Sequence, residues 1–256
     1  MIDLHSHILD SIDDGAKSFD ESCQMINEAI QNGVTDIFAT PHYILESKKY
    51  EAANEIKEEK IKILKSKFKG KINLHLGNEI YINNQIEELI SENKIKPLAN
   101  SKYLLIELPI VNEFPALDKY LFRLRSKGYM IIIAHPERYH YFREDFDKVV
   151  ALCKQGVLFQ GSYMSLYGVY GPDSKKMFKK MLKHQCYSFI ASDIHHSNKG
   201  FYEKLDDVFH KVVKVTSKEY ANKIFNENGL KVINNEKIES DFKEKISVFK
   251  RIRGKK

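Results

Sequence analysis

Short β-branched or apolar runs alternate with segments of helical spacing along the chain, and this alternation limits the fold more than any other feature. Seven such runs are predicted to be strands: "IDLH" (2–5), "VTDIFAT" (34–40), "INLHLG" (72–77), "YLLIEL" (103–108), "YMIIIAH" (129–135), "VLFQG" (157–161) and "YSFIAS" (187–192). Helices are predicted over 19–32, 46–69, 84–92, 115–127, 144–155 and 173–185, and from about 202 onward. This order predicts an α/β fold with a parallel sheet, as a closed barrel or an open doubly wound sheet.

No linker rich in proline or glycine interrupts the alternation, so residues 1–256 are predicted to form a single domain. Its C-terminal part, about 202–250, is expected to be helical and to end in a basic tail. Residues 241–256 hold seven basic and two acidic side chains, which gives +5 of the net charge of +6. The rest of the chain is therefore nearly neutral, which argues against a nucleic-acid partner.

The sequence shows neither a membrane span nor a leader. No run approaches the roughly 18 apolar residues of a membrane helix, and no basic segment precedes an apolar one at the N-terminus. The three cysteines, Cys23, Cys153 and Cys186, are odd in number and form no CxxC motif, which is typical of reduced thiols. We therefore expect a cytoplasmic protein.

Side chains that suit a metal ion recur where the predicted strands end. His5 and His7 close the first strand, and Asp13 and Asp14 follow shortly after. Later strands are followed or closed by His42, Glu79, Glu107, His135, Asp193 and His195. Taken singly, such residues are more often structural. Parallel strands present their carboxyl ends at one edge, however, so the repetition indicates a shared site.

Imidazoles mixed with carboxylates favour zinc, manganese or iron over magnesium or calcium. Eight or nine ligands exceed the need of one ion, so two or three divalent ions are expected. Sites of this kind hold phosphate and lower the pKa of bound water. The other histidines lack the pattern and are predicted to be structural or solvated: His75, His140, His184, His196 and His210.

Six motifs resemble those of the polymerase-and-histidinol-phosphatase (PHP) superfamily, and more closely its branch of bacterial capsule-associated protein-tyrosine phosphatases. They are, in order, "DLHSHILDSIDDGAKS", "ATPHY", "GNEI", "IELP", "AHPERY" and "SDIHH". The resemblance implies a distorted barrel of seven βα units, a (β/α)7 TIM-like barrel of the PHP type. It also implies a trinuclear metal site, often of manganese, with iron and zinc as alternatives.

The resemblance also implies roles for individual residues. One metal would be held by His5, His7, Glu79 and Asp193, a second by Glu79, Glu107 and His135, and a third by Asp14, His42 and His195. The choice between Asp13 and Asp14 stays open. Arg138 corresponds to the phosphate-binding arginine of the family, and His42 and His195 are the other residues expected to act in catalysis. Lys199 stands near the place of a second arginine and supplies charge without its bidentate fork.

The implied reaction is hydrolysis of phosphotyrosine on a protein, with a metal-bridging hydroxide as the nucleophile. A phenolate leaves readily because its pKa is about 10. None of the cysteines begins a C-x5-R loop, which excludes a cysteine-nucleophile phosphatase. By the same resemblance, the substrate is the tail of a membrane-associated bacterial tyrosine kinase that regulates capsule or exopolysaccharide synthesis.

The loop "SYMSLYGVYG" (162–171) follows the one strand without a candidate ligand. Its tyrosines, Tyr163 and Tyr167 above all, are predicted to form part of the wall that receives the substrate ring. Packing within the loop is the plainer alternative.

Three other functions remain open. A histidinol-phosphate phosphatase or a metal-dependent exonuclease would use the same ligands, although the near-neutral barrel disfavours the nuclease. A non-catalytic metal-binding scaffold that docks on a kinase would not need Arg138. The sequence does not determine the oligomeric state, and a homo-oligomer is one of the alternatives.

Overall fold

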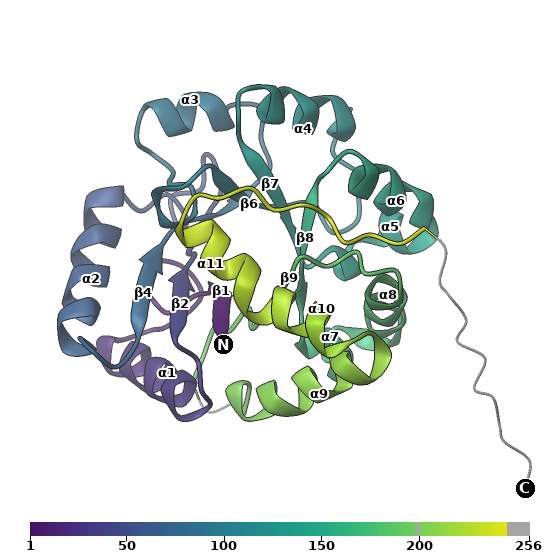
Figure 1. Ribbon diagram of the computed structural model, residues 1–256. Helices are drawn as coiled ribbons and strands as arrows, with labels where there is room; N and C mark the ends of the chain where they lie inside the picture. The colour runs from purple at the N-terminus through teal and green to yellow at the C-terminus, as the bar shows by residue number, and fades with distance from the viewer. Residues whose placement is uncertain (198–199, 245–256) are drawn as a thin grey trace, which may run out of the picture.

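The computed structural model describes residues 1–197 and 200–244, in which nine parallel strand segments form a ring (Figure 1). One sheet has the order β1-β2-β4 and the other the order β3-β5-β6-β7-β8-β9. A bridge between Ser6 and Ile194, beyond the end of β9, joins the two sheets and closes the ring. The strands are β1 (Ile2–Ser6), β2 (Asp36–Ala39), β3 (His42–Tyr43), β4 (Asn73–Leu76), β5 (Glu79–Tyr81), β6 (Tyr103–Glu107), β7 (Met130–Ala134), β8 (Leu158–Ser162) and β9 (Phe189–Ala191).

All seven predicted strands are present, but two of them continue beyond a break. The second resumes after Pro41 as β3, and the third resumes after Gly77 as β5. Pro41 cannot donate to a ladder, and a side chain on Gly77 would meet the Cα of Leu98 at 2.9 Å. The second and third strands pair with each other on both sides of the break, β2 with β4 and β3 with β5, while β2 also pairs with β1 and β5 with β6.

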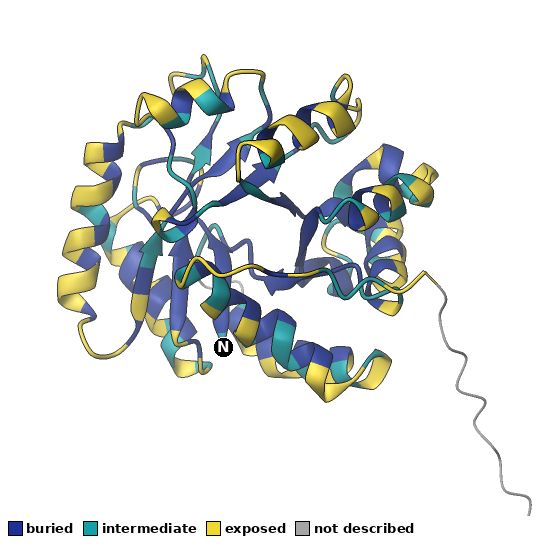
Figure 2. Cartoon of the chain, turned by 45° about the horizontal axis from the view of Figure 1, so that its top comes forward, coloured by how far each residue is buried: buried dark blue, intermediate teal, exposed yellow. Residues whose placement is uncertain are grey.

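Helices cover the outside of the ring, and their outer faces are exposed while their inner faces are buried (Figure 2). They are α1 (Phe19–Gln31), α2 (Asn54–Lys67), α3 (Ile86–Ser91), α4 (Leu117–Ser126), α5 (His140–Glu144), α6 (Phe146–Lys154), α7 (Met164–Tyr167), α8 (Gly171–Lys183), α9 (Leu205–Val215), α10 (Lys218–Asn222) and α11 (Asn228–Ile233). The Ser18 side chain caps α1 by accepting from the backbone N–H of Glu21. The helix predicted over 46–69 begins later, because Glu46 takes a left-handed conformation (φ +65°) and a turn follows it.

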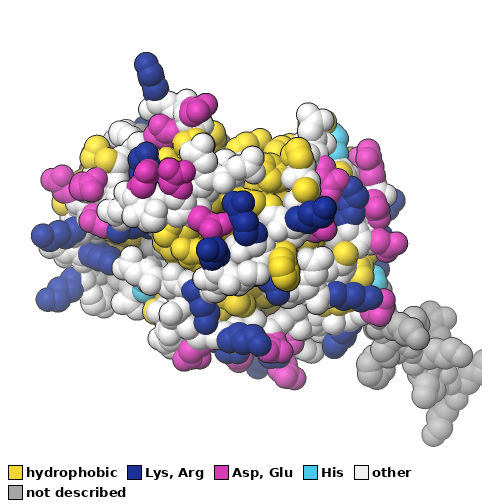
Figure 3. All heavy atoms as spheres, turned by 90° about the horizontal axis from the view of Figure 1, so that it is seen from above, with side chains coloured by type: hydrophobic (Ala, Val, Ile, Leu, Met, Phe, Trp, Pro, Cys, Tyr) yellow, Lys and Arg dark blue, Asp and Glu magenta, His cyan; other side chains and the backbone are white. Residues whose placement is uncertain are grey.

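Basic and acidic side chains are interspersed on the face above α3 and α4 (Figure 3). This agrees with the nearly neutral charge of the chain outside its basic tail. No helix in the described part of the chain is long and apolar enough to cross a membrane.

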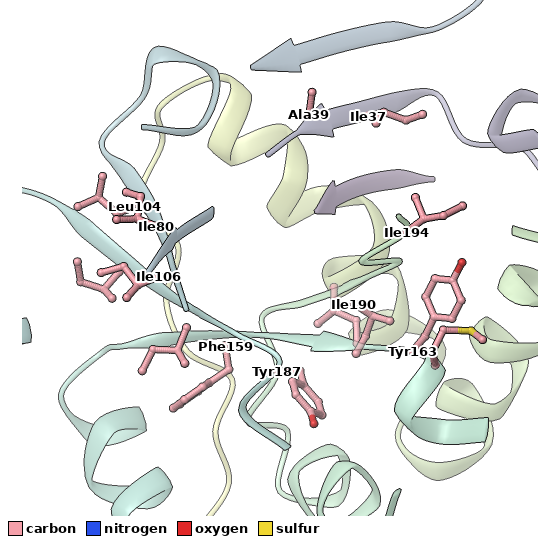
Figure 4. Close-up of a cluster of buried hydrophobic side chains, with 14 of the residues drawn as sticks. Ile37, Ala39, Ile80, Leu104, Ile106, Phe159, Tyr163, Tyr187, Ile190 and Ile194 are labelled. Carbon is pink, nitrogen blue, oxygen red and sulfur yellow. The ribbon is translucent and has the colours of Figure 1, made fainter. Parts of the chain in front are cut away.

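The period of two along each strand separates two layers of core. Leu104 and Ile106 of β6 pack outward with residues such as Phe159 and Ile190, between the ring and the helices (Figure 4). Leu105 alternates with them and packs in a second cluster with Leu4, Phe38, Ile132, Leu158 and Phe189. Glu107 follows Leu105 by two residues, so the same face of β6 changes from apolar to acidic toward its carboxyl end.

The C-terminal part of the described chain closes the other end of the ring. Helix α11 crosses the centre in Figure 1, and Val232 and Ile238 pack into the cluster that contains Leu4. The approach is close at Gly229, where an added Cβ would lie 2.6 Å from Cγ2 of Ile2. The prediction of helix up to about 250 is wrong for residues 234–244, because Asn235 is left-handed (φ +55°) and ends α11. The basic tail beyond residue 244 lies outside the described residues.

Candidate metal centre

The nine predicted metal ligands meet at the carboxyl ends of the strands. Three groups offer ligand atoms within 4.8 Å of one another: His5, His7, Glu79 and Asp193; His42, Glu79 and Glu107; and His7, Asp14, His42 and His195. The ninth residue, His135, joins the second group, since its Nε2 lies 2.9 Å from Oε1 of Glu79 and 3.8 Å from Oε1 of Glu107.

The first group is fully enclosed. His5 Nε2 lies 3.1 Å from Oε2 of Glu79 and 3.4 Å from Oδ1 of Asp193. His7 Nε2 lies 3.4 Å and 3.6 Å from the same two oxygens. All four residues are buried, with at most 3% of their surface exposed, and their ligand atoms converge on one small space.

Glu79 lies at the centre of the cluster. Its Oε2 also lies 3.0 Å from Nδ1 of His42, so four imidazoles from the ends of three strands surround one carboxylate. The breaks in the second and third strands produce this contact, because they place His42 and Glu79 opposite one another as the first residues of β3 and β5. One carboxylate that faces two groups of ligands is the arrangement that a bridging ligand requires.

The third group is the most open. Oδ1 of Asp14 lies 3.6 Å from Nε2 of His42 and 3.7 Å from Nε2 of His195. The Asp14 side chain is 45% exposed and that of His195 28% exposed. A ligand that enters the site would therefore meet this group first.

Irregular backbone directs several of these side chains. A register shift in β1 between Asp3 and Ser6 adds one residue, so both Leu4 and His5 can face the inside of the ring. His135 and Asp193 have positive φ angles, +32° and +56°. Such strain in non-glycine residues is typical of functional sites.

Two further residues orient the imidazoles, and the sequence analysis assigned neither of them this role. Oε1 of Gln160 lies 2.8 Å from Nδ1 of His5, and Oδ2 of Asp13 lies 2.7 Å from Nδ1 of His7. Each contact leaves Nε2 free to face the centre. Gln160 lies in β8, the strand without a ligand, and a buried glutamine within the run "VLFQG" is the signal that could have identified it.

Asp13 and Asp14 therefore have different surroundings, although they are adjacent in the sequence. Asp13 also accepts from the backbone N–H groups of Gly15 and His42, whereas Asp14 faces the open group. Gly15 makes this turn feasible, since a Cβ there would lie 2.2 Å from the carbonyl oxygen of His7.

Charges in the cluster perturb one another strongly. Burial lowers the pKa of His5, but the carboxylates of Glu79 and Asp193 outweigh it and raise that pKa to about 9. Burial and the charge of Glu79 raise the pKa of Glu107 to about 7. Burial and the neighbouring His7 lower the pKa of His195 to about 4. Carboxylates gathered this closely repel one another and favour a positive charge between them, either a proton on an imidazole or a metal ion.

The donor set fits divalent metal ions. Within the cluster, Glu79 Oε2 and His42 Nδ1 are buried without a well-aligned hydrogen bond, and unpaired buried polar atoms are costly. Ligands about 2.1 Å from a shared tetrahedral ion lie about 3.4 Å apart. The contacts of the first group have this spacing.

A pocket of about 620 Å³ opens over the cluster. Arg138 reaches it from the turn after β7, and its guanidinium carbon lies 4.6 Å from the ring centre of Tyr170. Its Nη1 lies 3.5 Å from Oδ2 of Asp193. Aromatic and aliphatic side chains form the rest of the wall: Ile44, Tyr50, Tyr81, Val169, Tyr170 and Phe201.

The structure does not place Tyr163 and Tyr167 at this pocket. Tyr163 is 1% exposed and packs in the core, and Tyr167 turns outward to donate to Asp207. Tyr170 of the same loop lines the pocket instead. His196, predicted to be structural, also lines it and lies 3.3 Å from Oε1 of Glu21. Lys199 lies outside the described residues.

Comparison with known proteins gives consistent results. Residues 1–234 match the family described as "Capsular polysaccharide synthesis, CpsB/CapC". The putative tyrosine-protein phosphatase CapC of Staphylococcus aureus is 40% identical over 76% of this chain and 77% of its own length. The tyrosine-protein phosphatase YwqE of Bacillus subtilis (strain 168) is 34% identical, again over 76% of this chain and 77% of its own length.

Solved structures resemble the fold as well. A chain from the crystal structures of YwqE from B. subtilis and CpsB from Streptococcus pneumoniae, described as metal-dependent tyrosine phosphatases, matches with a TM-score of 0.84 and 29% identity. The match covers 94% of this chain and 97% of that one. Histidinol phosphate phosphatase from Lactococcus lactis, at 16% identity and a TM-score of 0.55, covers 83% of this chain and 94% of its own and shares the fold alone.

Proposed function

The chain belongs to the CpsB/CapC family of capsular polysaccharide synthesis, and on this premise we propose that it is a metal-dependent protein-tyrosine phosphatase. The observation that carries the proposal is a cluster of nine convergent ligands beneath one pocket, which an arginine and an aromatic wall also line. The ligands suit phosphate hydrolysis, the arginine suits a phosphoryl group and the wall suits a phenyl ring.

Each part of the pocket has a task in this reaction. Bound divalent ions would lower the pKa of water to supply the nucleophile and would offset the charge of the phosphate. Arg138 would donate to two phosphoryl oxygens, and its contacts with Tyr170 and Asp193 hold the guanidinium at the pocket. His42 and His195 line the pocket and would act in the reaction through the ion that they hold. Tyr170 and Phe201 would pack against the substrate ring.

We further propose two or three ions, with manganese as the first candidate and iron or zinc as alternatives. His5, His7, Glu79 and Asp193 would hold one ion. Glu79, Glu107 and His135 would hold the second, and Asp14, His42 and His195 the third. Their proximity supports this division, with His42 also beside the second group.

The substrate we propose is a phosphotyrosine-containing protein, namely the tail of a membrane-associated bacterial tyrosine kinase, met in the cytoplasm. The names of the relatives support the phosphotyrosine substrate. Lys199 is proposed to add positive charge near the bound phosphate.

The test uses the full chain, purified and analysed for metal content. The protein is treated with a chelator and reloaded with manganese, iron or zinc in turn. It is then assayed with a phosphotyrosyl peptide, histidinol phosphate and single-stranded DNA. We expect hydrolysis of the peptide alone, lost on chelation and restored by one of the metals.

Two arginine variants complete the test. We expect Arg138→Ala to lower kcat/KM by about 100- to 1,000-fold. Arg123→Ala, on exposed α4 and paired with Glu87, removes the same side chain far from the cluster and should have no effect. Equal turnover of Arg138→Ala and the native chain, or preference for histidinol phosphate, would refute the proposal.

A further inference from the structure

Helix α8 concentrates positive charge on the outside of the ring. Its 13 residues contain five lysines and only one acidic residue, Asp173. Lys175, Lys179 and Lys183 recur every four residues, so they form one row along the helix. Along the sequence this row is distinct from the basic tail, which the sequence analysis treated as the main site of positive charge.

The row borders a groove of about 440 Å³ between α8 and α9, which are neighbours on the outside of the ring (Figure 1). Lys211 and Lys214 of α9 line the groove as well, so five ammonium groups surround it. Apolar side chains complete its lining: Leu166, Leu182 and Val215. Val215 is 45% exposed, which leaves apolar surface open to a ligand.

Little negative charge offsets these lysines. Among the residues that the structure describes, only Lys211 of the five lies within salt-bridge distance of a carboxylate, that of Asp207. Positive charges gathered around a concave, partly apolar surface attract an anionic ligand and raise its local concentration.

The groove adjoins the metal pocket through one short turn. Tyr167 lines the groove, and Val169 and Tyr170 line the pocket over the metal ligands. Only two residues lie between Tyr167 and Tyr170, so their α-carbons are within about 11 Å of each other. Lys211 Nζ lies 4.4 Å from the centre of the Tyr167 ring, so its charge lies in the part of the groove that this turn lines. A chain bound in the pocket could therefore continue into the groove.

We propose that this groove binds acidic residues that flank the phosphotyrosine of the substrate polypeptide. The proposal rests on the proposed function, and it names the class of substrate sequence that the enzyme prefers. An acidic segment would pair its carboxylates with the lysines and pack its side-chain stems on the apolar lining. We favour a polypeptide over a lipid surface because the site is concave and is lined by Tyr167, one short turn along the chain from Tyr170 of the pocket.

The test compares two phosphotyrosyl peptides that differ only in their flanks, glutamates in one and glutamines in the other. The triple variant K179E/K183E/K214E reverses the charge of the groove. The matched control K62E/K65E/K69E makes the same change in net charge on and just after α2, where all three lysines are exposed. A small aryl phosphate, 4-nitrophenyl phosphate, reports on the pocket alone.

For the native chain and the control, we expect a KM about tenfold lower for the glutamate peptide, with kcat unchanged. The groove variant should lose this preference and keep its turnover of the aryl phosphate. In about 0.5 M salt the preference should shrink, because exposed charges are then screened. Equal KM values for both peptides with the native chain, or a preference that persists in the groove variant, would overturn the proposal.

Two further measurements separate the alternatives. Anisotropy of a labelled, unphosphorylated glutamate peptide should show binding to the native chain and none to the groove variant. If the metal-loaded native chain hydrolyses no phosphate ester, the proposed function is wrong. The anisotropy measurement would still show whether the groove binds an acidic peptide. Sedimentation with phosphatidylserine vesicles tests the lipid alternative. Vesicle binding that the groove variant loses, without any peptide preference, would assign the groove to a membrane instead.

Discussion

Replacing Lys57 with methionine should stabilise the protein at neutral pH. Lys57 lies on α2 and is 1% exposed, and no carboxylate of the described chain is within salt-bridge distance of its ammonium group. Its Nζ donates to Oδ1 of Asn78 at 3.3 Å and lies 5.9 Å from the ring centre of Tyr43. Burial, with help from the charge of Lys96, lowers the pKa of Lys57 from 10.5 to about 8.

This shift sets the size of the effect. Keeping the ammonium charged in the folded state below pH 8 costs about 3 kcal/mol relative to the unfolded chain. The lost hydrogen bond offsets about 1 to 2 kcal/mol, although Oδ1 of Asn78 still accepts from the backbone N–H of Lys96. The net gain for Lys57→Met is therefore about 1 to 2 kcal/mol, or a rise in Tm of about 5 °C.

The sign of the pH dependence follows from the same shift. Between about pH 8 and 10.5 the unfolded chain holds a proton on Lys57 that the folded chain has released. The stability that Lys57 contributes to the native protein therefore rises with pH in this window. The advantage of the methionine variant should be full at pH 7 and should diminish steadily above pH 8.

Urea unfolding followed by circular dichroism measures this difference at pH 7, 8, 9 and 9.5. Comparing the variant with the native chain at each pH cancels the ionisation of groups common to both. Lys62→Met, an exposed position of the same helix, is the control and should change the free energy of unfolding by less than about 0.5 kcal/mol. The reasoning is refuted if Lys57→Met is less stable than the native chain at pH 7 by the same amount as at pH 9.5.

Three further predictions concern the ring and its cluster. Gln160→Leu should weaken metal affinity by about 10- to 100-fold, because Nδ1 of His5 loses its partner. Titration of the apoprotein with metal measures the affinity, and excess metal should restore the turnover of the variant. Gly229→Ala should lower stability by about 1 to 3 kcal/mol, since the new methyl group would overlap Ile2; an unchanged Tm would contradict the close approach of α11 to β1. Chelation of bound metal should lower the Tm, and manganese at 100 times its Kd should restore about 2.7 kcal/mol of the free energy of unfolding. Calorimetry measures both effects. Equal Tm values with and without metal would exclude binding to the folded state.

Hydrophobic patterning sufficed to predict the strands. The period-two alternation around Leu104 and Leu105 and the glycine stops between elements are local signals, and the structure places strands where they occur. The end of each run also predicted where His5, Glu107 and His135 would meet, because parallel strands share one carboxyl edge.

Other features depend on contacts between distant segments, which local patterns do not encode. The break that sets β3 and β5 apart from β2 and β4 divides the ring into two sheets, which no local pattern shows. The role of Gln160 depends on the approach of β8 to β1, some 155 residues apart. Tyr170 rather than Tyr163 reaches the pocket because of the way the chain turns around Gly168, and three tyrosines in one loop look alike in the sequence.

The closure of the ring between β1 and the segment after β9 has a consequence for the timing of assembly. His5 is synthesised 188 residues before Asp193, which corresponds to about 10 to 40 s of translation. During this interval the chain carries an incomplete set of ligands. The enclosed group can exist only after the ring closes. The metal ions available where closure happens, rather than where translation starts, would therefore decide which ion this protein acquires.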